Sequence, residues 1–210
     1  MDRIIAAEVT GNGAEIFVRE TAGNISRQLL PFTPWLLAEK GVALPEGAAE
    51  IELSGAAELD CRIEFASLEA YENALPELKK TPGVMTIRDL SCQFLSLSGM
   101  RLFAGMDFSE LKRMQFAVIP DTDGKTVSGI EVGGSGNFAA RFDLENCSNE
   151  AEIIAAFDRA VSEFDPDVLE GFNIFREDLP FLEKRAKKLK YHFTCGRNGE
   201  TFESRKSRFA

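Results

Sequence analysis

The stretch DPDVLEGFNIFREDLPFLEKRA, residues 165–186, decides the fold of the second half of the chain. Its short apolar run, residues 168–172, follows the turn signal Asp-Pro-Asp, which is typical of a buried strand. Gly171 allows a close approach of the backbone, and Asn173 offers amide donors and an acceptor. Asp178 stands where a helix is expected to begin. The stretch therefore predicts a strand, a polar loop and a helix, with the functional side chains at the strand end.

This stretch resembles the second exonuclease motif of family B DNA polymerases. That motif reads approximately Asp-Pro-Asp, two hydrophobic residues, Gly-Tyr-Asn after one further residue, a spacer, aromatic-Asp and Leu-Pro-Tyr-Leu. In the family, the aspartate binds a catalytic metal in a ribonuclease H-like proofreading domain. The resemblance implies that Asp178 is the catalytic and metal-binding residue, whereas Glu177 replaces the expected aromatic residue. The nucleic-acid contacts that it implies are Gly171, Phe172, Asn173 and Phe175.

Two further segments resemble family B polymerases, especially bacterial ones. The segment PFTPWLL, residues 31–37, is similar to a Phe-x-Pro-Trp segment of the N-terminal domain, although a plain core plug is the alternative that we favour for it. The segment GMDFSELKRMQ, residues 105–115, resembles the approach to the first exonuclease strand. We therefore expect two domains: residues 1–110 of the N-terminal type, and residues 111–210 as an incomplete ribonuclease H-like 3'-5' exonuclease-like domain.

The apolar patterns predict an α/β (α+β) fold in which a β-rich N-terminal domain precedes the truncated ribonuclease H-like domain. Period-2 segments separated by turn signals predict an antiparallel meander at the start of the chain. Apolar residues at helical spacing predict three helices. The pattern of residues 90–97 fits a helix or a strand. The expected strands include residues 4–9, 14–19, 24–30, 60–65, 84–87 and 168–172, with further strands within residues 126–142, and the expected helices are residues 68–80, 149–164 and 179–190.

The first exonuclease motif is degenerate in this chain. After the glutamine, the family continues with apolar-Asp-Ile-Glu-Thr, and these two carboxylates hold the metals. Here Ala117 and Ile119 occupy the two positions, which lie on one face of a strand because side chains alternate. Neither side chain offers the oxygen ligands that Mg²⁺ requires. The family's third motif, a tyrosine followed four residues later by an aspartate, does not occur after Asp178.

One alternative is an active nuclease with a rearranged metal site. Its candidate ligands are Asp121, Asp167, Glu177 and Asp178. We expect Asp121 to lie at a hairpin tip instead, because Pro-Asp-Thr-Asp-Gly is a strong turn signature. The glycine cluster at residues 133–136 likewise predicts a hairpin, because no helix that could bind phosphate is expected to follow it.

Composition narrows the function classes. The 210 residues carry 34 acidic and 24 basic side chains, a net charge of −10, which disfavours tight DNA binding by bulk phosphate neutralisation. The four cysteines form no Cys-x-x-Cys pair and are expected to be free thiols. No secretory signal or membrane span is expected, so we predict a cytoplasmic protein. The expected helix 179–190 carries a basic set, expected to be exposed: Lys184, Arg185, Lys187, Lys188 and Lys190.

Together these features predict a family B DNA polymerase exonuclease-like protein that acts in DNA binding, replication or repair without metal-dependent exonuclease or polymerase activity. No cofactor is expected to bind tightly, and Mg²⁺ or Mn²⁺ would be needed if the site were active. The expected partners are single-stranded DNA and a separately encoded polymerase subunit, with no membrane. The alternatives are the active exonuclease and a protein-interaction module.

Overall fold

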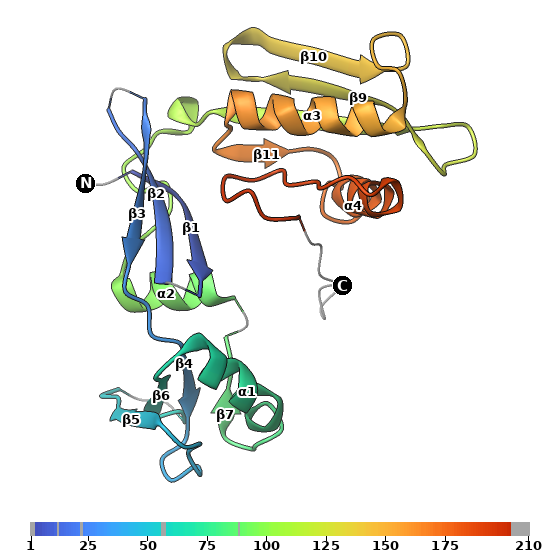
Figure 1. Ribbon diagram of the computed structural model, residues 1–210. Coiled ribbons are helices and arrows are strands. Elements are labelled where there is room, and N and C mark those ends of the chain that lie inside the picture. Colours follow the sequence, from blue (N-terminus) through green and yellow to red (C-terminus); the bar gives the residue numbers. More distant parts are fainter. Residues whose placement is uncertain (1–2, 12, 22, 56–57, 88, 203–210) are drawn as a thin grey trace. The chain divides into compact units, whose positions relative to one another are not determined.

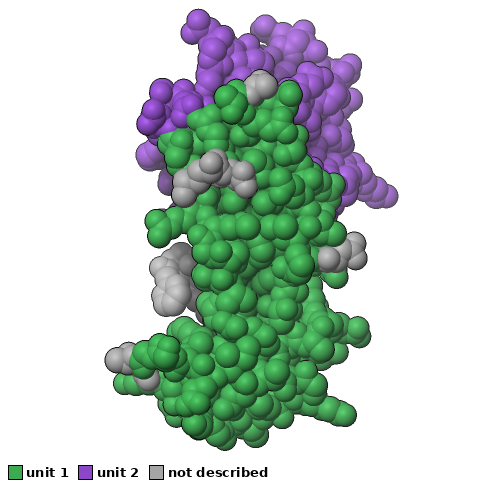
Figure 2. Space-filling model, turned by 90° about the vertical axis from the view of Figure 1, so that its left-hand side faces the viewer, with its two compact units in different colours: residues 1–106 green, residues 107–210 purple. Residues whose placement is uncertain are grey.

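The computed structural model describes residues 3–11, 13–21, 23–55, 58–87 and 89–202. The chain forms two compact units, residues 1–106 and 107–210, which are coloured separately in Figure 2. The mixed α/β fold class is confirmed, with three sheets and four α-helices among the described residues (Figure 1). The division falls after Met106, whereas the sequence analysis places the boundary near residue 111.

The first unit opens with an antiparallel meander, β1 (Ile4–Thr10), β2 (Gly13–Arg19) and β3 (Ile25–Leu30). This confirms the predicted meander. Gly13, with φ +138°, starts β2 where a Cβ atom would lie 2.5 Å from the Leu30 carbonyl oxygen, so only glycine fits.

A second antiparallel sheet of the first unit has the order β5-β6-β4-β7. Its strands are β4 (Trp35–Ala38), β5 (Ala48–Glu52), β6 (Cys61–Phe65) and β7 (Val84–Met85). Trp35 is buried in the core, as we expect for this segment, and it is the first residue of strand β4.

Two helices pack on the sheets of the first unit. Helix α1 (Leu68–Leu78) begins at the cap Ser67, whose side chain accepts a hydrogen bond from the Ala70 backbone N–H. The undecided segment is helix α2 (Leu90–Ser98), which contacts β1. Its helical form is fixed by the Asp89 N-cap and by Gly99 in the left-handed conformation at its end.

The second unit contains a four-stranded sheet of order β10-β9-β8-β11. Its strands are β8 (Arg113–Pro120), β9 (Val127–Gly134), β10 (Phe138–Asp143) and β11 (Val168–Glu170). The first three run antiparallel, whereas β11 pairs in parallel with β8. The glycine cluster lies at the β9–β10 connection and includes the 3-10 turn η2 (Ser135–Asn137), so the predicted hairpin is confirmed.

The helices of the second unit are α3 (Glu150–Phe164) and α4 (Asp178–Leu189), preceded by a 3-10 turn, η1 (Phe108–Glu110). Helix α3 begins at the cap Asn149, and its apolar stripe packs on β9 and β10 (Figure 1). This is the face that the even-numbered residues of β8 share, and it forms the core.

One prediction about α4 is wrong. Arg185 is buried, not exposed, because its guanidinium forms two hydrogen bonds of 2.7 and 2.6 Å with the carboxylate of Glu150 at the start of α3. The exposed basic side chains of α4 are Lys184, Lys187 and Lys188, and Lys190 follows the helix. Among the residues that the structure describes, no helix is long and apolar enough to cross a membrane.

Candidate functional site

The loop between β11 and α4 presents two aromatic rings to solvent. Phe172 and Phe175 are 91% and 80% exposed, whereas Ile174 between them is buried and anchors the loop. At Gly171 a Cβ atom would lie 2.2 Å from the Ile174 side chain and 2.7 Å from the Phe116 carbonyl oxygen. Only glycine therefore lets the loop leave the sheet at this point.

Asn173 determines the turn that leads into α4. Its backbone is left-handed, with φ 61°, a conformation that asparagine adopts more readily than most residues. Its carbonyl oxygen accepts hydrogen bonds from the backbone N–H groups of Arg176 and Glu177, both at 2.9 Å. Its side-chain Nδ2 donates to Glu177 Oε1 at 3.3 Å. The side-chain amide of Asn173 is therefore oriented by Glu177, the residue that replaces the aromatic residue of the motif.

Asp178 opens α4 and lies against β8. Burial raises the pKa of its carboxyl group, and the negative charge of Glu177 raises it further, whereas a hydrogen bond from the Val118 backbone N–H opposes the shift. Val118 lies between the two degenerate positions of β8. The structure therefore brings Asp178 and the first-motif positions together.

The open face of the sheet carries those first-motif positions. On β8, Met114 and Phe116 are buried in the core, so Ala117 and Ile119 lie on the opposite face. Ala117 is exposed and is in register with Glu131 of β9. Glu131 therefore lies beside the position that a motif carboxylate would occupy.

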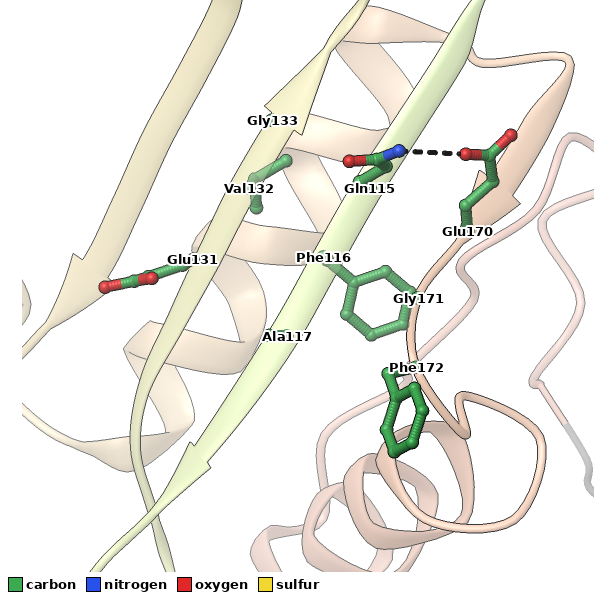
Figure 3. A pocket seen from close by; sticks show the side chains of 9 residues that line it. All are labelled: Gln115, Phe116, Ala117, Glu131, Val132, Gly133, Glu170, Gly171 and Phe172. Atoms are coloured by element: carbon green, nitrogen blue, oxygen red, sulfur yellow. Dashed lines mark hydrogen bonds between the residues drawn. The ribbon is translucent and has the colours of Figure 1, made fainter.

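An open pocket of about 660 Å³ lies on this face, between β8, β9 and the end of β11 (Figure 3). Glu170 of β11 forms an ion pair with Arg113, and this contact lowers the pKa of the Glu170 carboxyl group. Glu170 also accepts a hydrogen bond from Gln115 Nε2 at 3.1 Å. Glu131 forms a 2.8 Å ion pair with Arg141. Neither glutamate is among the site residues that the sequence predicts. The alternation of β9 could have placed Glu131 on the open face, but not in register with Ala117.

Two carboxylates that are candidate alternative ligands have structural roles: Asp167 joins the segments that precede β8 and β11, and Asp121 holds a turn. Asp167 accepts a hydrogen bond from the Lys112 backbone N–H at 2.9 Å and lies 3.4 Å from the Arg197 guanidinium. Asp121 accepts from the Thr126 hydroxyl at 2.6 Å, and this contact is the main cause of its lowered pKa. The hairpin-tip interpretation of Asp121 is thereby confirmed.

Residues 115–209 match the family described as DNA polymerase family B, exonuclease domain. A DNA polymerase of Thermococcus litoralis is 47% identical over 53 residues, 25% of this chain and 3% of the relative. The DNA polymerase delta catalytic subunit of Schizosaccharomyces pombe is 46% identical over 44 residues, 21% of this chain and 4% of the relative.

The family B DNA polymerase structure from Pyrobaculum calidifontis superposes with a TM-score of 0.64 at 19% identity, covering 93% of this chain and 33% of that chain. The second unit is related to the exonuclease domain of family B DNA polymerases. The chain spans only about a third of the solved polymerase, and the matches to the curated relatives cover a few per cent of their length. The particular likeness to bacterial members stays a prediction.

The residues of this exonuclease-like unit do not fit a two-metal site. Ala117 and Ile119 supply no ligand atoms, which leaves Asp178 as the one carboxylate at the matched motif positions. Within the described ranges, no group of three or more histidine, cysteine, aspartate or glutamate side chains could hold a metal ion. Divalent metals are associated with the family's exonuclease domains, but these side chains do not reproduce the donor set.

Proposed function

We propose that the exonuclease-like unit binds single-stranded DNA without hydrolysing it. The observation that carries the proposal is a division within the site. The loop with Phe172 and Phe175 displays two exposed rings, while the first-motif positions hold Ala117 and Ile119. The exposed rings offer a surface on which bases could stack, whereas the first-motif positions offer no oxygen ligand for a metal ion.

The absence of hydrolysis follows from the chemistry of phosphodiester cleavage. A two-metal reaction needs cations about 3.5–4 Å apart that activate the attacking water and stabilise the leaving oxygen. The nearby carboxylates do not replace the missing pair, because Glu131 is paired with Arg141 and Glu170 with Arg113. Asp178 alone does not assemble such a pair of ions.

Binding would rest on stacking of bases against Phe172 and Phe175. Each stacked base contributes about 1–3 kcal/mol when measured by alanine substitution, and stacking does not depend on base sequence. The exposed Lys184 and Lys188 of α4 add cations that a phosphate backbone can approach. Because the whole chain has a net charge of −10, we expect moderate affinity that falls as salt rises.

The deciding experiment combines cleavage and binding. End-labelled single-stranded DNA is incubated with Mg²⁺ or Mn²⁺ and either the wild type or Asp178→Ala, and binding is measured by fluorescence anisotropy in EDTA. We expect no cleavage by either protein, and binding that weakens about tenfold for each of Phe172→Ala and Phe175→Ala. Cleavage that disappears in Asp178→Ala would contradict the proposal and restore the rearranged nuclease. No DNA binding would leave the exposed rings as a protein-interaction surface.

The setting of this activity is also a proposal. The relatives are DNA polymerases, which supports action beside a polymerase partner in replication or repair. All four cysteines are free thiols, which suits a cytoplasmic protein. Co-purification of a polymerase chain with the tagged protein, lost in a variant lacking both exposed rings, would test the partner.

A further inference from the structure

Glu177 occupies an unusual place in the loop. It is the residue before α4, with φ −122° and ψ −70°, and its side chain makes no capping hydrogen bond. Instead its carboxylate accepts a hydrogen bond from Asn173 Nδ2, four residues earlier. The backbone N–H of Glu177 also donates to the Asn173 carbonyl oxygen. The two residues are thus joined through both side chain and backbone.

This contact affects the surface that a DNA strand would meet. Asn173 lines a second open pocket of about 390 Å³, together with Phe175 and Arg176. Because Nδ2 faces Glu177, one amide hydrogen is already committed, and the carboxylate that receives it is exposed. A phosphodiester that approaches Asn173 therefore meets the Glu177 carboxylate as well as the Arg176 side chain that lines the pocket.

A second carboxylate strengthens the effect. Asp178 follows directly, and the interaction of its charge with that of Glu177 is unfavourable. The neighbouring glutamate of β11, Glu170, is neutralised by Arg113, whereas Glu177 has an uncharged amide as its side-chain partner. Glu170 lines the same pocket but is paired with Arg113, so of these three carboxylates Glu177 is the one that contacts the Asn173 amide.

We infer that Glu177 limits strand binding at this loop, both by holding the Asn173 amide and by placing a carboxylate beside it. The inference rests on the proposed DNA binding and names the residue that sets its strength. Glu177→Gln keeps an acceptor for Asn173 but removes the charge. Glu177→Ala removes both, and releases the amide for a base or a phosphate.

The test is fluorescence anisotropy with a labelled oligothymidylate in EDTA over a salt series. We expect Glu177→Gln to bind about three- to tenfold more tightly than wild type at low salt, with a smaller gain as salt rises. Glu183→Gln is the matched control, because it removes the same charge from α4 at a residue that pairs with Lys187. We expect its affinity to change less than about twofold.

A double-mutant comparison separates the two contributions. If Glu177 acts partly through the amide, the extra gain of Glu177→Ala over Glu177→Gln disappears when Asn173 is alanine. Wild-type binding with equal affinities for Glu177→Gln and Glu183→Gln would overturn this inference and leave the proposed function intact. Absence of binding by wild type and Glu177→Gln alike would overturn both. Binding by Glu177→Gln alone would support the inference.

Discussion

The buried ion pair between α3 and α4 gives the sharpest test of the packing. Arg185 donates two hydrogen bonds to Glu150, and their side chains are only 8% and 14% exposed. Glu150 Oε1 also accepts from the Val127 backbone N–H at 2.8 Å. One carboxylate therefore connects both helices and β9. Arg185→Ala would remove the positive partner and leave this carboxylate buried.

The expected cost is large. Removing one partner of a buried ion pair costs about 3–5 kcal/mol, because an uncompensated charge remains. The Val127 hydrogen bond stays and the carboxylate retains slight exposure, so we expect the lower end, about 3 kcal/mol. For a unit of roughly 100 residues this lowers the melting temperature by about 12–24 °C. It is a large fraction of the ~5–15 kcal/mol that stabilises a domain.

Urea unfolding followed by far-UV circular dichroism measures this cost, with hydrogen exchange in α4 to locate it. The control is Lys187→Ala, which removes an exposed charge from the same helix and should cost less than about 1 kcal/mol. Replacing Glu150 and Arg185 together with apolar residues should cost less than Arg185→Ala alone, since no buried charge is left. Equal costs for Arg185→Ala and Lys187→Ala would refute the reasoning.

Three further predictions concern other parts of the chain. Asp178→Asn should raise the free energy of unfolding at pH 7. Because the pKa of Asp178 is raised, its protonated form stabilises the fold at low pH, and this contribution is lost as the pH rises through the folded-state pKa. Thermal melts should show this gain shrinking towards acidic pH, and a pH-independent difference would argue against it. Gln93→Leu should lower the free energy of unfolding by about 2–3 kcal/mol, because Gln93 is fully buried with hydrogen bonds to Trp35, Tyr71 and Ile87. Urea unfolding followed by tryptophan fluorescence measures this cost, and a value under about 1 kcal/mol would contradict the prediction. Ala117→Asp with Ile119→Glu should create saturable Mn²⁺ binding by calorimetry, and binding that persists without Asp178 would show that the ligands are elsewhere.

Local patterns predicted most of the fold because the relevant signals lie within single elements. The alternation in the first three strands and the apolar stripe of α3 were sufficient for those elements. The apolar spacing of residues 90–97 suits both a helix and a strand, and only the caps Asp89 and Gly99 show that the segment is a helix. The burial of Arg185 could not be predicted, since its partner lies 35 residues earlier in the chain.

The candidate site likewise contains residues that local sequence predicts and residues that only the folded sheet brings together. The motif predicts Asn173 in the loop after the strand and Asp178 at the start of α4, and the contact with Val118 brings Asp178 to β8. Glu131 lies outside the motif and reaches the site through strand register. Glu170 lies within the motif stretch, but its place beside Gln115 depends on the register of β11 with β8. Register is a property of paired strands, so a single stretch of sequence does not contain it.

The charges of the open face explain how such a surface is stable without cations. In a metal site, carboxylates converge and depend on the ions for neutralisation. Here Glu170 is paired with Arg113 and Glu131 with Arg141, whereas burial and the charge of Glu177 disfavour the ionised form of Asp178. The two strand carboxylates thus have cationic protein partners, and the alkyl groups of the first motif add no further charge. On the proposed binding role, this face needs no metal ion to keep its two strand carboxylates paired, and Glu177 is the residue that we expect to set how strongly DNA binds.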